Sequence, residues 1–482
     1  MTLTTAMNSA KSVFSNTGEQ SSVVSKNIAN SGNTNYVKRY TNIVTTTDGA
    51  TVVSIGRSEN LIMQKQMLAS NSDSAGQDAL LDGLERLKSV LGGNDYELSP
   101  STYMAQLYDD LQAYAAKPGE ISLAQTAVSS AQDVANSLNK TTTAVQDVRE
   151  QADLDISNSV TDLNALLANL QKVNDQIVSL TSTGGDANDY LDQRDGIVSE
   201  ISSIVGVTVQ TRSNNDLVLY TSDGTTLFET IPRTVTFQAQ TVYDAGTVGN
   251  SVYIDGTAVK FGSGGDTSAQ GTIAANLQLR DEIAPTFQNQ LDEVARGLIT
   301  VFDDSGVPGL FAWSDPSSGV TLPGDPLPSA TIYQGLAGLI SVNSDYVSSA
   351  GGDPTRLRDG NSTDMNPSDN AGYTDLLTGY MDAMSASMDF DPESELDEST
   401  SLLNFSTDSV GWLEEYRSNA TSASEKKTAM LQRAQQAYSS ETGVSLDEEL
   451  ALLLDIEQSY KAASKLLSTV DEMMQSLLTA VG

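Results

Sequence analysis

The feature that most constrains the fold is a heptad repeat over the last part of the chain, residues 445–478. One row of apolar residues recurs at every seventh position, and a second row follows three places further on. Two such rows form one apolar seam along a helix, which is the pattern of a coiled coil. Only Glu449 breaks the second row. The first row contains Leu446, Leu453, Tyr460, Leu467 and Met474, and the second contains Ile456, Ala463, Val470 and Leu477.

This helix has a defined start, because Ser445 and Glu448 have the spacing of a capping box. A long helix with so narrow a seam requires a partner, and the first 28 residues offer one. Their own heptad rows are weaker and contain more small or polar side chains. The alternative is a pair of ordinary amphipathic helices that close a globular domain. The N-terminal rows are Leu3, Ala10, Thr17 and Val24, and Met7, Phe14, Ser21 and Ile28.

The composition argues against several classes of function. The chain has 482 residues, which predicts two to four domains, and 63 acidic against 26 basic residues give a formal net charge of -37. We therefore expect no nucleic-acid partner and no membrane partner, since both require a basic surface. With no cysteine and no histidine, the usual catalytic triads and zinc sites are excluded. We expect no enzymatic activity, no cofactor and no metal ion.

Neither a signal peptide nor a membrane helix is predicted. The N-terminus lacks a basic segment followed by an apolar run. No stretch approaches the roughly 18 apolar residues that a membrane helix needs. If the protein leaves the cell, we expect export without a cleaved signal peptide.

The first half of the chain is predicted to be a hairpin followed by long helices. Residues 41–57 alternate polar and apolar side chains around Asp48-Gly49, which is a hairpin signal. Helical spacing then continues to about residue 205. Its longest stretch, residues 120–180, is either one helix of about 90 Å or two helices broken near Asp153–Asp155.

The second half begins with a change of period. From residue 207 to about 261 the apolar residues alternate with period two between Asn- and Gly-containing turns, which predicts a small antiparallel β domain. Residues 304–372 are rich in proline and glycine and are predicted to be an irregular insertion. Helical spacing returns between these two regions and again after residue 372.

We therefore predict a mainly α fold with an inserted β-rich domain, long antiparallel helices and a terminal coiled coil formed by both chain ends. Three domains are expected. They are a terminal helical coiled-coil domain (1–40 and 440–482), a long-helix domain (41–205, 271–303 and 373–439) and a β-rich, irregular outer domain (206–270 with 304–372).

The polar segment after the first helix is more specific than a helix end requires. Asn27-Ile28-Ala29-Asn30 leads through a turn to Tyr36. This resembles the signature shared by the flagellar axial proteins of rod, hook and hook–filament junction, in which the four residues lead to a Thr, a Gly and a Tyr. Here Thr34 comes one position late and Asn35 replaces the Gly. Asn tolerates left-handed backbone geometry better than most residues.

Two further segments extend the resemblance. Asp192-Gln193-Arg194-Asp195 has the charges of a helix N-terminus, with Arg194 as the ion-pair partner of Asp192. It also resembles a segment characteristic of the hook-associated protein 1 family, which joins hook to filament. Residues 443–450 and 468–473 are similar to the C-terminal signature of the axial proteins. Three matches in the correct order identify the chain as a member of the hook-associated protein 1 family.

The resemblance implies a structural role in the bacterial flagellum and in motility. The chain would be an adaptor outside the cell that joins hook to filament by packing its terminal helices into a helical assembly. The implied partners are copies of itself, hook protein, the second junction protein that leads to the flagellin filament, and an export chaperone at the C-terminal helix. We expect both seams to bury their apolar stripes only after assembly. The expected interface residues are Leu3, Met7, Phe14, Val24, Ile28, Leu446, Leu453, Ile456, Tyr460, Leu467, Val470, Met474 and Leu477.

Two alternatives remain open. A flagellin-like or other axial subunit would share the terminal coiled coil. For flagellin and the second junction protein, Asn27–Asn30 argues against both, because the resemblance places that signature elsewhere. A secreted enzyme or carbohydrate-binding module would place its active part in residues 207–370 and use the helices as a stalk, because folds alone do not exclude it.

Overall fold

The computed structural model describes all but a few short segments of the chain. The described residues are 3–46, 49–303, 309–314, 321–322 and 329–481. The chain divides into two compact units, which we describe separately. Unit 1 comprises Met1–Ser74, Asp162–Val235 and Lys427–Gly482, and unit 2 comprises Ala75–Thr161 and Thr236–Lys426. The three domains predicted from the sequence stay a prediction.

Helices make up most of the described chain, which confirms the predicted mainly α fold with small antiparallel sheets. Three long helices, α2 (Leu61–Val90), α4 (Ile121–Thr183) and α11 (Leu402–Thr442), contribute residues to both units. Of the two alternatives for residues 120–180, the structure has the single continuous helix. Asp153, at the point where a break was considered, lies within this helix, and its buried carboxylate is paired with Arg280 at 2.5 Å.

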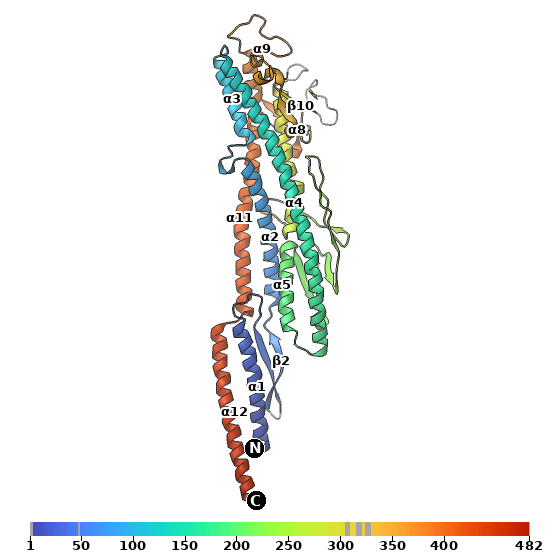
Figure 1. Cartoon of the computed structure of the whole chain (residues 1–482), viewed down its shortest axis with the longest axis vertical. Coiled ribbons are helices and arrows are strands. Elements are labelled where there is room, and N and C mark those ends of the chain that lie inside the picture. The colour runs from blue at the N-terminus through green and yellow to red at the C-terminus, as the bar shows by residue number, and fades with distance from the viewer. Residues whose placement is uncertain (1–2, 47–48, 304–308, 315–320, 323–328, 482) are drawn as a thin grey trace. The chain divides into compact units, whose positions relative to one another are not determined.

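Unit 1 contains both ends of the chain. Helices α1 (Leu3–Ala29) and α12 (Leu446–Val481) lie side by side and antiparallel, with both termini at the same end (Figure 1). Strands β1 (Arg39–Thr46) and β2 (Gly49–Arg57) form an antiparallel hairpin that also contacts α1. This confirms the predicted hairpin, although its turn residues 47–48 lie outside the described residues.

The rest of unit 1 is a helical layer with a small sheet. α5 (Asn188–Ile204) packs on the last turns of α4 through an apolar cluster that includes Ile177 and Leu191. α4 ends at Thr183, and the next residue, Gly184, has a φ of 74°, a left-handed conformation that glycine adopts without strain. The sheet is antiparallel, in the order β3-β4-β5-β6. Its strands are β3 (Val207–Thr211), β4 (Leu217–Thr221), β5 (Thr226–Glu229) and β6 (Ile231–Pro232).

Unit 2 is built around one large apolar core to which its helices contribute leucine, valine and phenylalanine side chains. α7 lies at the centre of this core and is buried on nearly all sides, including its polar residues. Glu293 and Arg296 within it form a buried ion pair at 2.8 Å, as polar groups in a core require. The helices that lie wholly in this unit are α3 (Pro100–Ala116), α6 (Thr272–Gln278), a π-helical segment (Leu279–Ile283), α7 (Ala284–Val301), α8 (Leu336–Leu339), α9 (Arg356–Asp359) and α10 (Asp375–Ser385).

Short strands and 3₁₀ turns complete the chain. The small sheets have the orders β7-β8-β9, β11-β10-β12 and β13-β14. Their strands are β7 (Val235–Thr236), β8 (Tyr253–Ile254), β9 (Thr257–Ala258), β10 (Phe311–Ser314), β11 (Thr321–Leu322), β12 (Ile340–Val342), β13 (Ser387–Asp389) and β14 (Ser399–Ser401). The 3₁₀ turns are Gly93–Asp95, Ser213–Asn215, Ser344–Tyr346, Ser348–Ala350 and Pro392–Ser394.

The described part of the region predicted to be an irregular insertion, residues 304–372, supplies buried side chains to the core of unit 2. Phe311, Leu336 and Tyr346 are among them. Within the described residues, no helix combines the length and the apolar character that crossing a membrane would require.

Candidate assembly interface

The terminal helices pair in a defined antiparallel arrangement. The end of α1 meets the start of α12, where Asn27 Nδ2 lies 3.0 Å from Glu449 Oε2. Nearer the middle of α1, the rings of Phe14 and Tyr460 are 4.4 Å apart between centroids. The predicted pairing of the two seams is therefore present within a single chain.

The second heptad row of α12 is buried against α1. Glu449, Ile456, Ala463 and Val470 are all buried and follow one another at intervals of seven. Leu477 continues the row but is exposed, because α12 has 36 residues and α1 only 27, so α12 extends past the start of its partner. The expectation that the seams bury their stripes only in the assembly is wrong for this row.

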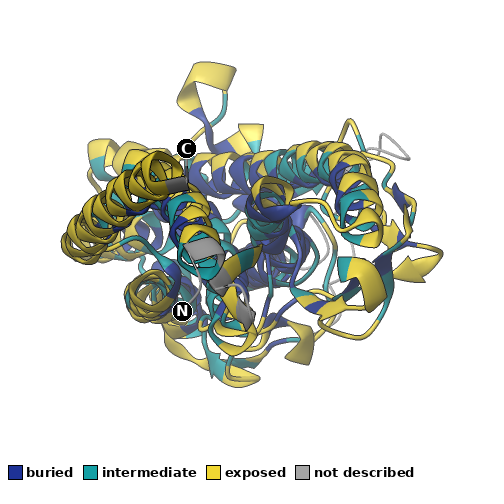
Figure 2. Ribbon diagram, turned by 90° about the horizontal axis from the view of Figure 1, so that it is seen from below, coloured by how far each residue is buried: buried dark blue, intermediate teal, exposed yellow. Residues whose placement is uncertain are grey.

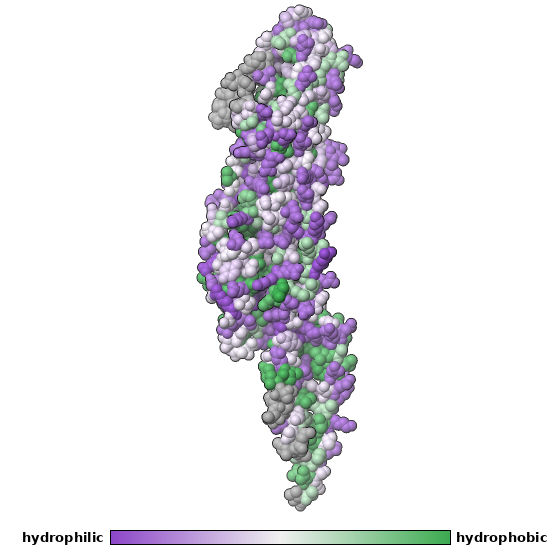
Figure 3. All heavy atoms as spheres, turned by 180° about the vertical axis from the view of Figure 1, so that it is seen from behind, coloured by the Kyte–Doolittle hydropathy of each residue, from purple (hydrophilic) through white to green (hydrophobic). Residues whose placement is uncertain are grey.

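The first heptad row of α12 lies at the edge of the contact and stays partly open to solvent. Leu446, Tyr460 and Met474 are exposed, and Leu453 and Leu467 are half-buried. Exposed residues dominate α12 in the burial view (Figure 2), and apolar side chains gather on the surface of the terminal region (Figure 3). Other exposed apolar residues of α12 are Leu450, Leu452, Leu454, Leu466, Met473 and Leu478.

α1 divides in the same way. Ala10, Thr17 and Val24 of its first row are buried, whereas Met7 is exposed, and Phe14 and Ile28 are half-buried. The side chain of Leu3 lies outside the described residues. An open groove of about 350 Å³ runs between the two helices near the chain termini. Its lining residues are Met7, Leu467, Ser468, Val470, Asp471 and Met474.

Asn27 of the axial-protein motif is the centre of a buried polar cluster at the base of this helix pair. Its Nδ2 donates hydrogen bonds to the Arg39 carbonyl at 2.9 Å and to Glu449 Oε2 at 3.0 Å. Its Oδ1 accepts hydrogen bonds from the Tyr36 hydroxyl at 2.8 Å and from the Arg39 backbone N–H at 3.0 Å. A side-chain amide has two donors and two acceptor sites, so every one of them is used.

Lys38 joins the same cluster from the loop before β1. Its Nζ lies 2.8 Å from Glu448 and 3.5 Å from the buried Glu449. The hydrogen bond to Glu448 raises the pKa of Lys38 and lowers that of Glu448. The capping box predicted at Ser445 is formed in one direction: the Ser445 hydroxyl accepts from the Glu448 backbone N–H at 3.4 Å.

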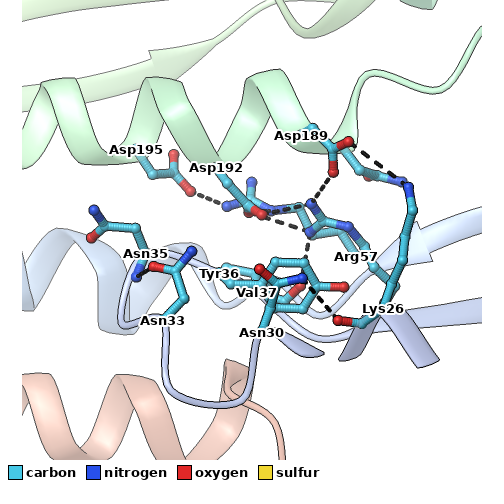
Figure 4. Close-up of polar contacts among 12 residues, drawn as sticks. Lys26, Asn30, Asn33, Asn35, Tyr36, Val37, Arg57, Asp189, Asp192 and Asp195 are labelled. Atoms are coloured by element: carbon cyan, nitrogen blue, oxygen red, sulfur yellow. Dashed lines mark hydrogen bonds and ion pairs between the residues drawn. The ribbon is translucent and has the colours of Figure 1, made fainter. Parts of the chain in front are cut away.

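The charged motif on α5 contacts the same end of the hairpin, the end opposite its turn. Asp192 accepts from Arg39 at 2.6 Å and from Arg57 at 2.9 Å, and Arg57 also pairs with Asp195 (Figure 4). Asp189 lies 3.3 Å from Arg39. Arg39 is the first residue of β1 and Arg57 is the last residue of β2. The carboxylates of α5 therefore bind both strands at the end of the hairpin opposite its turn.

Burial shifts the pKa values of the ionisable groups in this cluster. Burial raises the pKa of Tyr36 to about 12, while the Arg39 guanidinium acts in the opposite direction, so the hydroxyl remains a donor. Burial also raises the pKa of Asp192, against the opposing effect of Arg39 and Arg57. Burial favours a lower pKa for Arg57, but Asp195 and Asp192 outweigh it and raise the pKa.

One pairing inferred from the sequence is wrong. Arg194 is not the ion-pair partner of Asp192; it donates a hydrogen bond to the Asn215 carbonyl at 2.5 Å, and burial lowers its pKa. Asp192 turns to Arg39 and Arg57 instead, which are more than 130 residues away in sequence. Gln193 is exposed.

The remaining motif residues have local roles. Asn30 Nδ2 donates to the Lys26 carbonyl at 2.9 Å and so caps the last turn of α1, while Ala29 is exposed. No pattern in the sequence points to Arg39, Arg57, Lys38 or Asp189. The one available signal was Glu449, the acidic break in an apolar row, which turns out to face Asn27. In the described residues, no three acidic side chains come together as a possible metal site.

Comparisons with known proteins agree with these features. The model of the FlgK helical domain of flagellar hook-associated proteins matches residues 84–310. The model of the C-terminal region of the flagellar basal body rod proteins FlgE, FlgF and FlgG matches residues 435–480, which include most of α12.

Several curated proteins are similar in sequence. Flagellar hook-associated protein 1 of Bacillus subtilis is 23% identical over 89% of this chain and 85% of that protein. Its counterpart from Escherichia coli is 24% identical over 56% of this chain and 49% of that protein. A solved structure described as the flagellar hook junction protein FlgK from Burkholderia pseudomallei superposes with a TM-score of 0.56. It is 14% identical and covers 77% of this chain and 99% of its own, which is a similarity of fold.

Proposed function

Because this chain belongs to the FlgK family of flagellar hook-associated proteins, we propose that it is a structural adaptor that joins hook to filament. The relatives named above are structural proteins of the flagellum, and nothing in the proposed role requires catalysis. One observation carries the mechanism: α12 buries one heptad row against α1 and leaves a longer set of apolar side chains uncovered. We propose that the terminal helices of neighbouring copies cover that set.

The size of the uncovered surface supports a stable interface. Burying a leucine-sized side chain completely contributes roughly 1.5–3 kcal/mol, so covering a half-exposed one contributes about 1 kcal/mol. Covering five such side chains would stabilise a contact by on the order of 5 kcal/mol. That gain has to exceed the repulsion between copies that each carry a formal charge of -37.

The finer assignments follow from the same surface. Hook protein and the second junction protein would contact this chain at the two ends of the layer that its copies form. An export chaperone would cover the apolar side of α12 before assembly, because an exposed stripe of leucines and methionines is otherwise an aggregation risk. The expected location is the flagellum outside the cell.

The proposed interface is tested by adding charge to α12 where its side chains make little contact with the rest of the chain. Leu454 and Leu466 are 59% and 54% exposed, so changing both to Glu leaves the α1–α12 contact in place. We expect this double variant to fold normally but to lose incorporation at the end of the hook, and cells that carry it to lose motility. Incorporation and motility at the wild-type level would reject the interface.

A matched control adds the same two charges elsewhere. Val248 and Leu154 are 83% and 45% exposed. Both belong to unit 2, whereas the terminal helices belong to unit 1. The Val248→Glu, Leu154→Glu variant should assemble like the wild type. Circular dichroism of both purified variants verifies that the folded helical content is unchanged.

A further inference from the structure

The face that α12 turns toward α1 is not the one that apolar burial alone would select. Its first heptad row consists of Leu, Leu, Tyr, Leu and Met, and these residues remain at the edge of the contact. Its second row begins with Glu449 and continues with Ile456, Ala463 and Val470, and all four are buried. Turning α12 about its axis toward the first row would bury more apolar surface and release Glu449 to water.

A buried carboxylate is costly unless it is hydrogen-bonded and paired. Glu449 meets this requirement in only one orientation of α12, in which it faces Asn27 at 3.0 Å and Lys38 at 3.5 Å. Asn27 cannot follow a turning helix, because its other three hydrogen bonds are to Tyr36 and to the backbone of Arg39.

We propose that the Asn27–Glu449 contact, supported by Lys38, sets the rotation of α12 and thereby decides which apolar row is kept free for partners. Glu449 acts as a positioning residue: it holds the smaller row against α1 so that the larger row stays uncovered. The same logic applies to a single polar residue in a coiled-coil seam, which specifies an arrangement at some expense of stability.

That the uncovered row is used by neighbouring copies rests on the proposed function, but the rotation of α12 is a property of the folded chain. It can therefore be measured without any assembly. If the rotation is as described and the α12 charge variants still assemble, the proposed function fails and this inference stands. If the charge variants do block assembly but the rotation does not depend on Glu449, the proposed function stands and this inference fails.

The absence of cysteine from the sequence makes the measurement direct, because any introduced cysteine is the only thiol. Val470, in the second row, is 6% exposed, and Met474, in the first row and one turn further on, is 44% exposed. Two single variants, Val470→Cys and Met474→Cys, are labelled with a maleimide and their rates compared. Because the positions are neighbours, fraying of the helix end affects both alike.

With Glu449 present, we expect Met474→Cys to react faster than Val470→Cys by on the order of tenfold, the difference between an open and a protected site. Adding Glu449→Leu should reduce this ratio to about threefold or less, as the first row turns toward α1 and the second turns away. Replacing Glu449 by Gln instead keeps a hydrogen-bond acceptor for Asn27, so Glu449→Gln should show the same ratio as the protein with Glu449. Glu449→Ala provides the same test without added bulk.

The control is Asp455→Leu, since Asp455 is exposed on α12 and is not part of the polar cluster around Lys38, so its replacement should leave the ratio unchanged. The direction of each rate separates positioning from simple support, because general loosening of the helix pair would speed the labelling of both cysteines. Replacing Glu449 alone leaves the buried amide of Asn27 without one partner, so Glu449→Leu should lower the melting temperature. Rotation of α12 should in addition speed the labelling of Val470→Cys and slow that of Met474→Cys. An unchanged ratio in both Glu449→Leu and Glu449→Ala, or equal labelling of both cysteines when Glu449 is present, would overturn the proposal.

Discussion

Removing the charge of Asp192 should destabilise unit 1 more than removing that of its exposed neighbour Asp189. The side chain of Asp192 is 12% exposed and pairs with two buried guanidiniums, those of Arg39 and Arg57. Removing one partner of a buried ion pair costs about 3–5 kcal/mol because the other charge is left uncompensated. Arg39 keeps the Val37 carbonyl and Arg57 keeps Asp195, and burial disfavours the ionised Asp192 itself, as its raised pKa shows. We therefore expect a smaller loss, about 2–3 kcal/mol, for Asp192→Asn.

The loss can be assigned to unit 1 because the two tryptophans, Trp313 and Trp412, both lie in unit 2. Tryptophan fluorescence therefore reports the unfolding of unit 2, whereas far-ultraviolet circular dichroism reports both units. In urea, Asp192→Asn should move a circular-dichroism transition to lower concentration and leave the fluorescence transition where it is. In a thermal melt, the shift should be about 5–10 °C for a unit of this size.

Asp189→Asn is the matched control, because Asp189 also contacts Arg39 but its side chain is 76% exposed. Exposed ion pairs contribute about 0–1 kcal/mol, so this variant should unfold almost like the wild type. A wild-type unfolding midpoint for Asp192→Asn, or an equal loss of stability in the two variants, would contradict a stabilising role of the Asp192 ion pairs.

Two further outcomes follow from buried groups elsewhere. The pKa of Tyr36 rises from 10 when unfolded to about 12 when folded. The protonated Tyr36 hydroxyl therefore contributes fully to the free energy of unfolding below pH 10. This contribution, up to about 2–3 kcal/mol, is lost as the pH rises from 10 to 12. Melting temperatures between pH 9 and 11 should fall less steeply in Tyr36→Phe than in the wild type. The control Tyr40→Phe, at an exposed position, should keep the wild-type slope. Equal slopes for all three proteins would contradict this role of Tyr36. In unit 2, a Cβ on Gly249 would clash with the guanidinium of Arg280, which is buried and paired with Asp153. Gly249→Ala should therefore lower the fluorescence-detected stability by about 2–3 kcal/mol, and an unchanged midpoint would show that Arg280 can move aside without cost.

Periodicity in the sequence was sufficient to predict the elements of the terminal region. The heptad rows located α1 and α12 and paired them, and the alternation around Asp48-Gly49 located the hairpin. These features depend only on neighbours within a few residues or on a repeat of seven. They are therefore visible without knowledge of the fold.

Contacts between distant segments could not be predicted in the same way. Arg194 was the nearest cation to Asp192 in sequence, but the fold brings Arg39 and Arg57 to it, and no local pattern distinguishes them from surface arginines. Similarly, the sequence showed that Glu449 interrupts a seam without showing what it faces. Its partner Asn27 lies near the other end of the chain.

The heptad pattern also could not predict which row of the α12 seam is buried and which stays uncovered. Both rows have the same period, so periodicity treats them as one stripe. Which row is buried depends on the polar contacts of Glu449 and on the length of α1. Both are properties of the packed helices.

The most direct test of the proposed role is the location of the protein on intact flagella. Immunogold labelling would use an antibody raised against residues 207–370, which lie outside the terminal helices. We predict a single narrow band of label at the boundary between hook and filament. Label along the whole filament, or label that is absent from flagella, would contradict the assignment as a hook–filament adaptor.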